Sequence, residues 1–465
     1  MEYQDKGEKL QRNAWIRMDD REVQQAYDLS KEYLGFLNQA RTEREAIAYI
    51  IEKAAQEGFV NLDSQKGFTP GQKLFYTSRQ KVCALIVIGE EPLEKGVNWV
   101  VSHIDSPRLD LKGRPLYEAD GIALLKTHYY GGIKKYQWLA LPLALHGVVV
   151  KADGTRLDIC LGEKEEDPVL TISDLLPHLA KEQMEKKMGE AISGEGLNAV
   201  IGNRPEKETD QNPIKAYVAR LLKDKYGIEE DDFTTAELEL VPAFPARDVG
   251  LDASMVGGYG QDDRVSAFTA LKAILEVEKP EKTAICLFAD KEEIGSTGNT
   301  GLDSLMIENL MVELLQRSGE KDYFTLRRSL SASHALSADV NAAVDPNYPD
   351  VWEKMNNSFL ANGVVLTKFT GSRGKSGSSD ANPEFMGRVR RLFEENQVVW
   401  QVGELGKVDI GGGGTVAQYL ARYGMEVVDC GVALLGMHSP FEVASKADIY
   451  MAYKAYRAFL QELPE

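Results

Sequence analysis

The stretch Phe288-Ala289-Asp290-Lys291-Glu292-Glu293-Ile294-Gly295-Ser296 decides how the rest of the chain is interpreted. The apolar run Thr283–Ala289 before it predicts a buried strand. The run stops at a cluster of acids and glycines, which is typical of an active site in an open α/β sheet. Adjacent Glu292 and Glu293 cannot point the same way, so one can face a metal while the other faces a substrate. Taken alone, the stretch fits a solvated acidic turn equally well. Similar residues at the ends of other strands are therefore needed to favour a site.

Composition excludes several classes of partner. The chain has 465 residues and a net charge of −18 without a basic patch, which argues against nucleic acid and anionic membrane. No apolar run is long enough to span a membrane, and the polar N-terminus lacks the apolar core of a signal peptide. The cysteines lie far apart in apolar runs, so we expect reduced core residues in a cytoplasmic protein. They are Cys83, Cys160, Cys286 and Cys430.

The pattern along the chain predicts a catalytic domain interrupted by an insertion. Residues 20–58 have a helical pattern, and short strands are expected at 73–76, 82–88 and 98–102. From residue 108 the chain is first β-rich, with a hairpin turn at Asp153-Gly154, and then polar and helical. Helix and strand patterns alternate again after a proline-containing linker near residue 243. We therefore expect a discontinuous catalytic domain, residues 1–107 and 243–465, and an inserted domain, residues 108–242.

Five possible metal ligands share one context, in which an apolar strand or a turn leads directly to the residue. They are His103, Asp262, Glu293, Asp339 and His438. Two imidazoles and three carboxylates suit a pair of Zn²⁺ ions, or Mn²⁺ or Co²⁺. A lone histidine is more often structural, Asp262 could interact with a helix dipole, and Asp339 could belong to a turn. Five such residues in the same context make these separate explanations weaker.

These local sequences and their order resemble the aspartyl aminopeptidase and vacuolar aminopeptidase I family of dinuclear zinc exopeptidases, in a bacterial-type form. The resemblance covers the chain from about His103 to the C-terminus. The matching stretches are His103-Ile104-Asp105-Ser106-Pro107, Gln261-Asp262-Asp263-Arg264, Glu292-Glu293-Ile294-Gly295-Ser296, Ser337-Ala338-Asp339 with Asp345-Pro346-Asn347-Tyr348, and Met437-His438-Ser439.

The resemblance implies how the ligands are divided. Asp262 is implied to bridge two ions, with His103 and Asp339 on one ion. Glu293 and His438 are implied to bind the other.

The resemblance also implies two roles that are not metal ligation. Glu292 is implied to be the general base, and Asp105 the carboxylate that orients the imidazole of His103. The family usually has threonine at Ile104, leucine at Gln261 and asparagine at Asp263. The last departure leaves a small question over which aspartate forms the bridge.

The resemblance implies the fold, activity and assembly as well. The fold is an α/β mixed sheet sandwiched between helices, zinc exopeptidase-like, with an inserted β-rich dimerisation domain. The activity is that of a metallo-aminopeptidase, an enzyme that uses two bound zinc ions to remove N-terminal amino acids from peptides. Dimers are implied to assemble into a homo-oligomeric dodecamer. Two alternatives are a different two-metal amidohydrolase, such as a deacylase, and an inactive assembly protein.

Two further segments are candidates for substrate contact. In Leu175–Ala180, His178 is implied to reach the active site of a neighbouring subunit, although a solvent-facing histidine fits equally well. The basic loop 368–377 carries Lys368, Arg373 and Lys375 and is implied to line a specificity pocket. An exposed loop is the alternative for it. The remaining histidines, among them His334, are expected to be structural.

Overall fold

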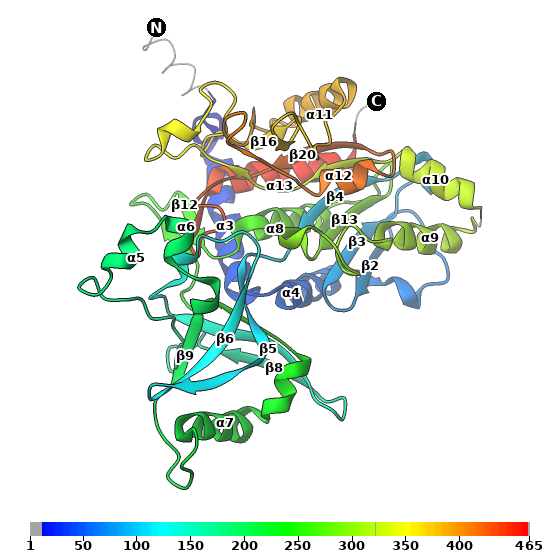
Figure 1. Cartoon of the computed structure of the whole chain (residues 1–465). Helices are drawn as coiled ribbons and strands as arrows, with labels where there is room; N and C mark the ends of the chain where they lie inside the picture. The colour runs from blue at the N-terminus through cyan, green and yellow to red at the C-terminus, as the bar shows by residue number, and fades with distance from the viewer. Residues whose placement is uncertain (1–11, 321, 464–465) are drawn as a thin grey trace. The chain divides into compact units, whose positions relative to one another are not determined.

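The computed structural model describes residues 12–320 and 322–463, and these residues form two compact units (Figure 1). The first unit runs to Asp105, resumes over Ala246–Met437 and continues from Phe441. The second unit comprises Ser106–Pro245 together with His438–Pro440.

A mixed sheet of nine strands forms the centre of the described part of the first unit. Its order across the sheet is β1 (Val60–Asn61), β2 (Lys73–Ser78), β3 (Val82–Val87), β13 (Ala284–Ala289), β4 (Asn98–His103), β14 (His334–Ser337), β20 (Glu426–Gly431), β16 (Val364–Thr367) and β18 (Trp400–Val402). The four central neighbours β13, β4, β14 and β20 are parallel to one another. Their carboxyl ends therefore lie along one edge of the sheet.

Helices cover both faces of this sheet, because its strands bury side chains on both sides. In β3, Cys83, Leu85 and Val87 belong to one core, whereas the alternate residues Val82, Ala84 and Ile86 belong to the other. The first core is closed by α2 (Ala14–Arg17), α3 (Asp20–Gln39), α4 (Glu43–Gln56), α8 (Gln261–Leu275), α11 (Pro383–Glu395) and α13 (Lys446–Gln461). The second is closed by α9 (Met306–Ser318), α10 (Tyr323–Ser331) and α12 (Ala417–Ala421). The predicted mixed sheet between helices is confirmed.

Local sequence explains where several of these elements begin and end. Thr42 caps α4, where its side chain accepts from the Glu45 backbone N–H and the Glu45 side chain reaches back, as the capping-box pattern predicts. The apolar run from Glu426 to Leu435 is divided at Val432 into β20 and β21 (Ala433–Leu435). These two strands belong to different sheets. The strand β21 belongs to a second sheet of this unit, whose order is β11 (Arg247–Val249), β12 (Met255–Gly258), β22 (Glu442–Ser445), β21 and β15 (Asn341–Ala342).

The second unit is built on an antiparallel sheet, six-stranded over the described residues. Its order is β8 (Arg156–Leu161), β7 (Leu143–Val150), β10 (Ala236–Pro242), β5 (Arg108–Ala119), β6 (Ile122–Tyr130) and β9 (Asn198–Gly202). The predicted hairpin at Asp153-Gly154 joins β7 to β8. The helices of this unit are α5 (Lys181–Glu185), α6 (Met188–Ala191) and α7 (Pro213–Tyr226).

One expectation about the core is wrong. Cys83, Cys286 and Cys430 are buried free thiols, as predicted, but Cys160 is exposed. Cys160 lies on β8 at the edge of its sheet, and its side chain points away from the core that its neighbours Ile159 and Leu161 enter. An apolar run on an edge strand still alternates between two faces, so burial of one face does not bury the other.

Among the described residues, no helix combines the length and the apolar character that crossing a bilayer requires.

Candidate metal centre

Three neighbouring parallel strands deliver three of the five predicted ligands to one edge of the sheet. His103 is the last residue of β4 and pairs with Ala289, the last residue of β13. The chain then makes a short 3₁₀ turn, Glu292–Ile294, that carries Glu292 and Glu293. Asp339 follows β14, the neighbour of β4 on its other side. Because parallel strands end at the same edge, residues that lie far apart in the sequence meet here.

The fourth strand of this group helps to place Asp339. Gly431 ends β20, beside β14. A side chain at Gly431 would put its Cβ 1.8 Å from the carbonyl oxygen of Asp339. Glycine is therefore required where the two backbones approach each other.

Asp262 comes from a different part of the unit. It stands at the start of α8, but Asp262 (φ −80, ψ 106) and Asp263 (φ −115, ψ 29) are not helical in backbone conformation. Asp262, Asp263 and Arg264 are all buried, with at most 3% of their surface exposed. The carboxylate of Asp262 therefore does not act as a solvated charge at a helix terminus. Its Oδ1 lies 3.2 Å from Nε2 of His103.

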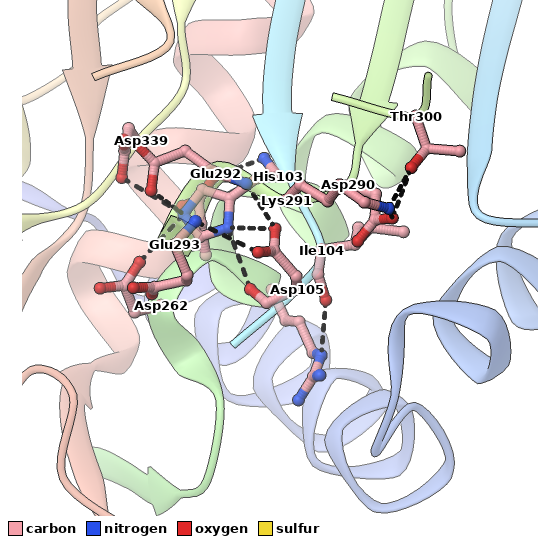
Figure 2. Close-up of polar contacts among 12 residues, drawn as sticks. His103, Ile104, Asp105, Asp262, Asp290, Lys291, Glu292, Glu293, Thr300 and Asp339 are labelled. Carbon is pink, nitrogen blue, oxygen red and sulfur yellow. Dashed lines mark hydrogen bonds and ion pairs between the residues drawn. The ribbon is translucent and has the colours of Figure 1, made fainter. Parts of the chain in front are cut away.

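The imidazole of His103 lies at the centre of a group of carboxylates (Figure 2). Besides Asp262, its Nε2 lies 3.8 Å from Oδ1 of Asp339 and 3.9 Å from Oε2 of Glu292. His103 is 1% exposed, and the Asp339 side chain is 11% exposed. Burial of carboxylates is costly unless they are paired or bind a metal, so this group of acids around one buried imidazole is suited to a metal ion.

Two groups among the described residues offer the right atoms for a metal ion. They are His103 with Asp262 and Glu293, and His103 with Asp263 and Asp339. Within each group, one ligand atom from each residue lies within 4.8 Å of the others. A set of one imidazole and several carboxylates is chemically suited to Zn²⁺.

The electrostatics of the site also fit a cation. Burial raises the pKa of the Asp339 carboxyl well above its usual value, against the opposing effect of His103. Burial, followed by the charge of Asp339, raises the pKa of Asp263 in the same way. Burial alone would lower the pKa of His103, but its hydrogen bonds to Asp105 and Asp262 raise it well above the usual value. The shifts of the two aspartates come first from burial, and that of His103 comes from the neighbouring carboxylates. A cation bound here would stabilise the ionised form of these carboxylates.

Asp105 connects the imidazole to the acidic turn. Its Oδ1 lies 3.3 Å from Nδ1 of His103, and its backbone carbonyl lies 3.0 Å from the same nitrogen. The two carboxylate oxygens also accept hydrogen bonds from the backbone N–H groups of Glu292 and Glu293, each at 3.1 Å. One buried carboxylate thus fixes both the ring and the turn, which extends the role expected from the sequence.

Several supporting residues were not found from the sequence. The backbone N–H of Asp262 donates to Oε2 of Glu442 on β22 at 3.0 Å, and the guanidinium of Arg264 donates to the Ile104 carbonyl at 3.2 Å. Just before the turn in the chain, Asp290 accepts from Lys291 at 2.8 Å and from Thr300 at 2.7 Å (Figure 2). Arg264 and Ile104 lie in stretches that carried the family resemblance, whereas Glu442, Asp290 and Thr300 do not.

Comparisons with known proteins identify the family of this chain. A family model described as aminopeptidase I zinc metalloprotease (M18) matches residues 36–460. The chain belongs to this family. A probable M18 family aminopeptidase 1 from Clostridium acetobutylicum is 50% identical, over 97% of this chain and 98% of its own length.

Solved structures of M18 proteins show the same fold. The crystal structure of an M18 aminopeptidase from Thermotoga maritima has a TM-score of 0.94 at 46% identity, and covers 97% of this chain and 99% of its own. A structure of the S. cerevisiae mApe1 dodecamer has a TM-score of 0.74 at 22% identity, and the match covers 94% of this chain and 97% of the yeast chain. The resemblance to the aminopeptidase I family is confirmed, and the protein is a zinc metallo-aminopeptidase that hydrolyses peptides.

The other candidate residues of this M18 aminopeptidase lie in different surroundings. His438 groups with the second unit, where its Nδ1 lies 2.8 Å from the Gly132 carbonyl. Neither of the two ligand groups found among the described residues includes it. His178 also belongs to the second unit and is exposed.

The basic loop of the M18 aminopeptidase is exposed at Lys368, Arg373 and Lys375. Asp380 accepts from the ammonium groups of Lys368, at 2.5 Å, and Lys375, at 2.8 Å. The loop pairs with the glycine-rich turn, since β17 (Gly371–Ser372) is antiparallel to β19 (Gly412–Gly413). Gly412 has φ +115, and a Cβ there would lie 2.2 Å from the Gly371 carbonyl oxygen, so this pairing requires glycine.

Proposed function

We propose that the cluster around His103 is the catalytic centre and that it holds two zinc ions, with Mn²⁺ or Co²⁺ as possible replacements. The ligands would be His103, Asp262, Glu293, Asp339 and His438. The observation that carries this proposal is the convergence of three carboxylates, those of Asp262, Asp339 and Glu292, on Nε2 of the buried His103, at 3.2 to 3.9 Å. Asp262 would bridge the ions, because it is the closest of these acids to the imidazole and comes from a separate element.

Within this centre, Glu292 would move the proton. Zinc, when bound, supplies a Lewis acid that polarises the scissile carbonyl and lowers the pKa of water. The Glu292 carboxylate would accept a proton from the attacking water as the C–O bond forms. It would then deliver that proton to the leaving amine nitrogen as the C–N bond breaks. Its side chain is 20% exposed, more than that of the ligand candidate Asp339, so a substrate can reach it.

Asp105 would position both participants without touching the substrate. Its hydrogen bonds hold the backbone of Glu292 and Glu293 and the ring of His103. Carboxylates that orient ligand imidazoles in this way are common at zinc sites.

We further propose that the second unit, which includes all of the predicted inserted domain 108–242, carries a dimer contact. Its segment from Leu175 to Met188 exposes several large apolar side chains, which is unusual for a surface that faces only water. They are Leu175, Leu176, Leu179, Met184 and Met188. A dodecamer built from such dimers is the proposed assembly, as in the yeast relative that carries that description.

His178 lies within this exposed segment and is proposed to serve the active site of a neighbouring subunit. His178→Phe should lower kcat by about 10-fold or more, because a hydrogen-bonding group would be lost from the substrate site. The zinc content should stay unchanged, because His178 is not among the proposed metal ligands. Chains inactivated by Glu292→Gln and chains inactivated by His178→Phe should recover part of the activity when they are reassembled together. Mixed oligomers, confirmed by mass, that recover no activity would show that His178 acts within its own chain.

We propose that the enzyme prefers neutral or apolar N-terminal residues. Asp380 pairs with both Lys368 and Lys375, so two of the three cations in the basic loop already have a carboxylate partner. The net charge of −18 also gives no steering toward acidic peptides.

Peptides are the proposed substrates, and the proposed location is the cytoplasm. Nucleic acid and membranes are not proposed as partners.

The kcat/KM of the zinc-loaded enzyme should be larger for leucine p-nitroanilide than for the Asp and Glu p-nitroanilides, by about 10-fold. N-acetyl-leucine should not be hydrolysed, because an aminopeptidase recognises a free amine, whereas a deacylase would cleave it. A strong preference for Asp or Glu that disappears in Arg373→Ala or Lys375→Ala would instead identify the loop as an acidic-residue pocket. Arg390→Ala, on the exposed side of α11, is the matched control.

A further inference from the structure

Glu442 is a buried acidic residue that is not among the proposed metal ligands. It begins β22, and 1% of its surface is exposed. Its Oε2 accepts a hydrogen bond, at 3.0 Å, from the backbone N–H of Asp262, the residue proposed to bridge the two ions. Burial of a carboxyl group is costly unless the group is hydrogen-bonded, so this contact stabilises both residues in their present places.

One strand pair and one turn bring Glu442 to Asp262. In the antiparallel pair of β12 and β22, Glu442 lies opposite Gly258. The chain then turns at Gly260, whose φ of +73 is a left-handed conformation that favours glycine, and enters α8. Backbone N–H groups at the start of a helix have no acceptor within the helix. The side chain of Glu442 supplies that acceptor to Asp262.

Gln261 ties the backbone of Glu442 to the same turn. Its Nε2 donates to the carbonyl of Glu442, at 2.6 Å, and to the carbonyl of Val256, at 3.1 Å. Its Oε1 accepts from the hydroxyl of Tyr33 on α3 at 3.3 Å. Burial, followed by the charge of Glu442, raises the pKa of Tyr33 well above its usual value, so the hydroxyl keeps the proton that it donates. The start of β22 is therefore held against the start of α8.

The carboxylate of Asp262 depends on contacts of this kind for its orientation. Asp262 and Asp263 do not have helical backbone conformations, so the regular hydrogen bonds of α8 do not fix them. Oδ1 of Asp262 nevertheless lies 3.2 Å from Nε2 of His103. The hydrogen bond to Glu442 is a contact from outside the helix that restricts the backbone carrying this carboxylate.

We propose that Glu442 is a positioning residue for the metal centre, and that its side-chain oxygen holds the backbone of Asp262 so that the Asp262 carboxylate stays beside His103. This role rests on the proposed two-zinc centre. Residues that orient metal ligands from behind typically change metal affinity by about 10–100-fold when they are replaced. The position requires an oxygen that accepts a hydrogen bond, whereas the negative charge of Glu442 is not required.

The rate at which zinc leaves the zinc-loaded enzyme, measured by transfer to a chromophoric chelator, tests this role. Glu442→Leu removes the acceptor and should release zinc about 10-fold faster than the wild type, or more. Glu442→Gln keeps an acceptor oxygen at the same reach, so its rate should stay within about threefold of the wild type. Glu395→Leu, at the exposed end of α11, is the matched control and should release zinc as the wild type does.

The Tm of the metal-free form of each variant separates positioning from a purely structural role. A structural role would lower this Tm and leave zinc release from folded Glu442→Leu unchanged, which would overturn the proposal. Equal acceleration in Glu442→Gln and Glu442→Leu would also overturn it, because the charge would then be what matters.

A further variant carries the test if Glu442→Leu does not fold. Glu442→Asp keeps a carboxylate but is one methylene shorter, so it should also release zinc faster than the wild type, and an unchanged rate would overturn the proposal. The zinc content of the wild-type enzyme is measured in the same experiment. Fewer than two zinc ions would refute the centre itself, whereas two ions with unchanged release from the folded variants would refute only the role of Glu442.

Discussion

Replacement of Glu292 by glutamine should lower kcat by about 10²–10⁴ while the zinc content of the enzyme stays the same. Glutamine has nearly the shape of glutamate but cannot accept a proton at neutral pH. The backbone hydrogen bonds from residues 292 and 293 to Asp105 do not involve the replaced side chain, so the turn should keep its conformation. The KM should change little, because the variant loses a proton acceptor and retains the substrate pocket.

The measurement is steady-state kinetics on leucine p-nitroanilide combined with elemental analysis of the same samples. Glu395→Gln, which removes an exposed glutamate from the end of α11, is the matched control and should behave as wild type. Loss of zinc from Glu292→Gln would make Glu292 a ligand, and full activity would exclude it as the base.

Asp262→Asn should have a different effect, in which both zinc ions are bound more weakly and activity falls by more than about 10²-fold at limiting zinc. The reason is that a bridging carboxylate neutralises two cations at once, whereas an amide carries no charge. The variant also leaves a buried imidazole beside an uncharged group, since Oδ1 of Asp262 lies 3.2 Å from Nε2 of His103. Zinc content after exhaustive dialysis, and recovery of activity as zinc is added back, measure this effect.

Asp263→Asn is the informative comparison, because Asp263 is adjacent and groups with His103 and Asp339 in the structure. Its side chain also accepts from the His103 backbone N–H at 3.3 Å. If Asp262 is the bridge, Asp263→Asn should retain more zinc than Asp262→Asn. The reverse order would assign the bridge to Asp263.

The strands β3, β4, β13 and β14 could largely be predicted because they are short and fully buried. The run that becomes β13 is recognisable from sequence, and so are the candidate ligands His103, at the end of β4, and Asp339, after β14, since each strand ends where a polar side chain begins. The parallel arrangement of these strands then accounts for the meeting of His103, Glu292 and Asp339.

Other features could not be predicted because they depend on contacts between distant segments. Glu442 is an ordinary polar residue in sequence, and only the pairing of β12 with β22 brings it to the backbone of Asp262. Cys160 was misplaced because an apolar run does not reveal that its strand lies at a sheet edge. His334 was expected to be structural, and its contact with Arg388 of α11, 3.0 Å from Nε2 to Nη1, joins segments that lie far apart in the sequence.

The central claim is that the acids around His103 divide into metal ligands and one proton acceptor. Anomalous diffraction at the zinc edge, from crystals of Glu292→Gln soaked with zinc and an amino-acid hydroxamate, tests it most directly. Two zinc peaks are expected, bridged by Asp262, with His103, Glu293, Asp339 and His438 as the remaining protein ligands and residue 292 outside the coordination sphere. A single peak, or two peaks held by a different set of residues, would contradict it.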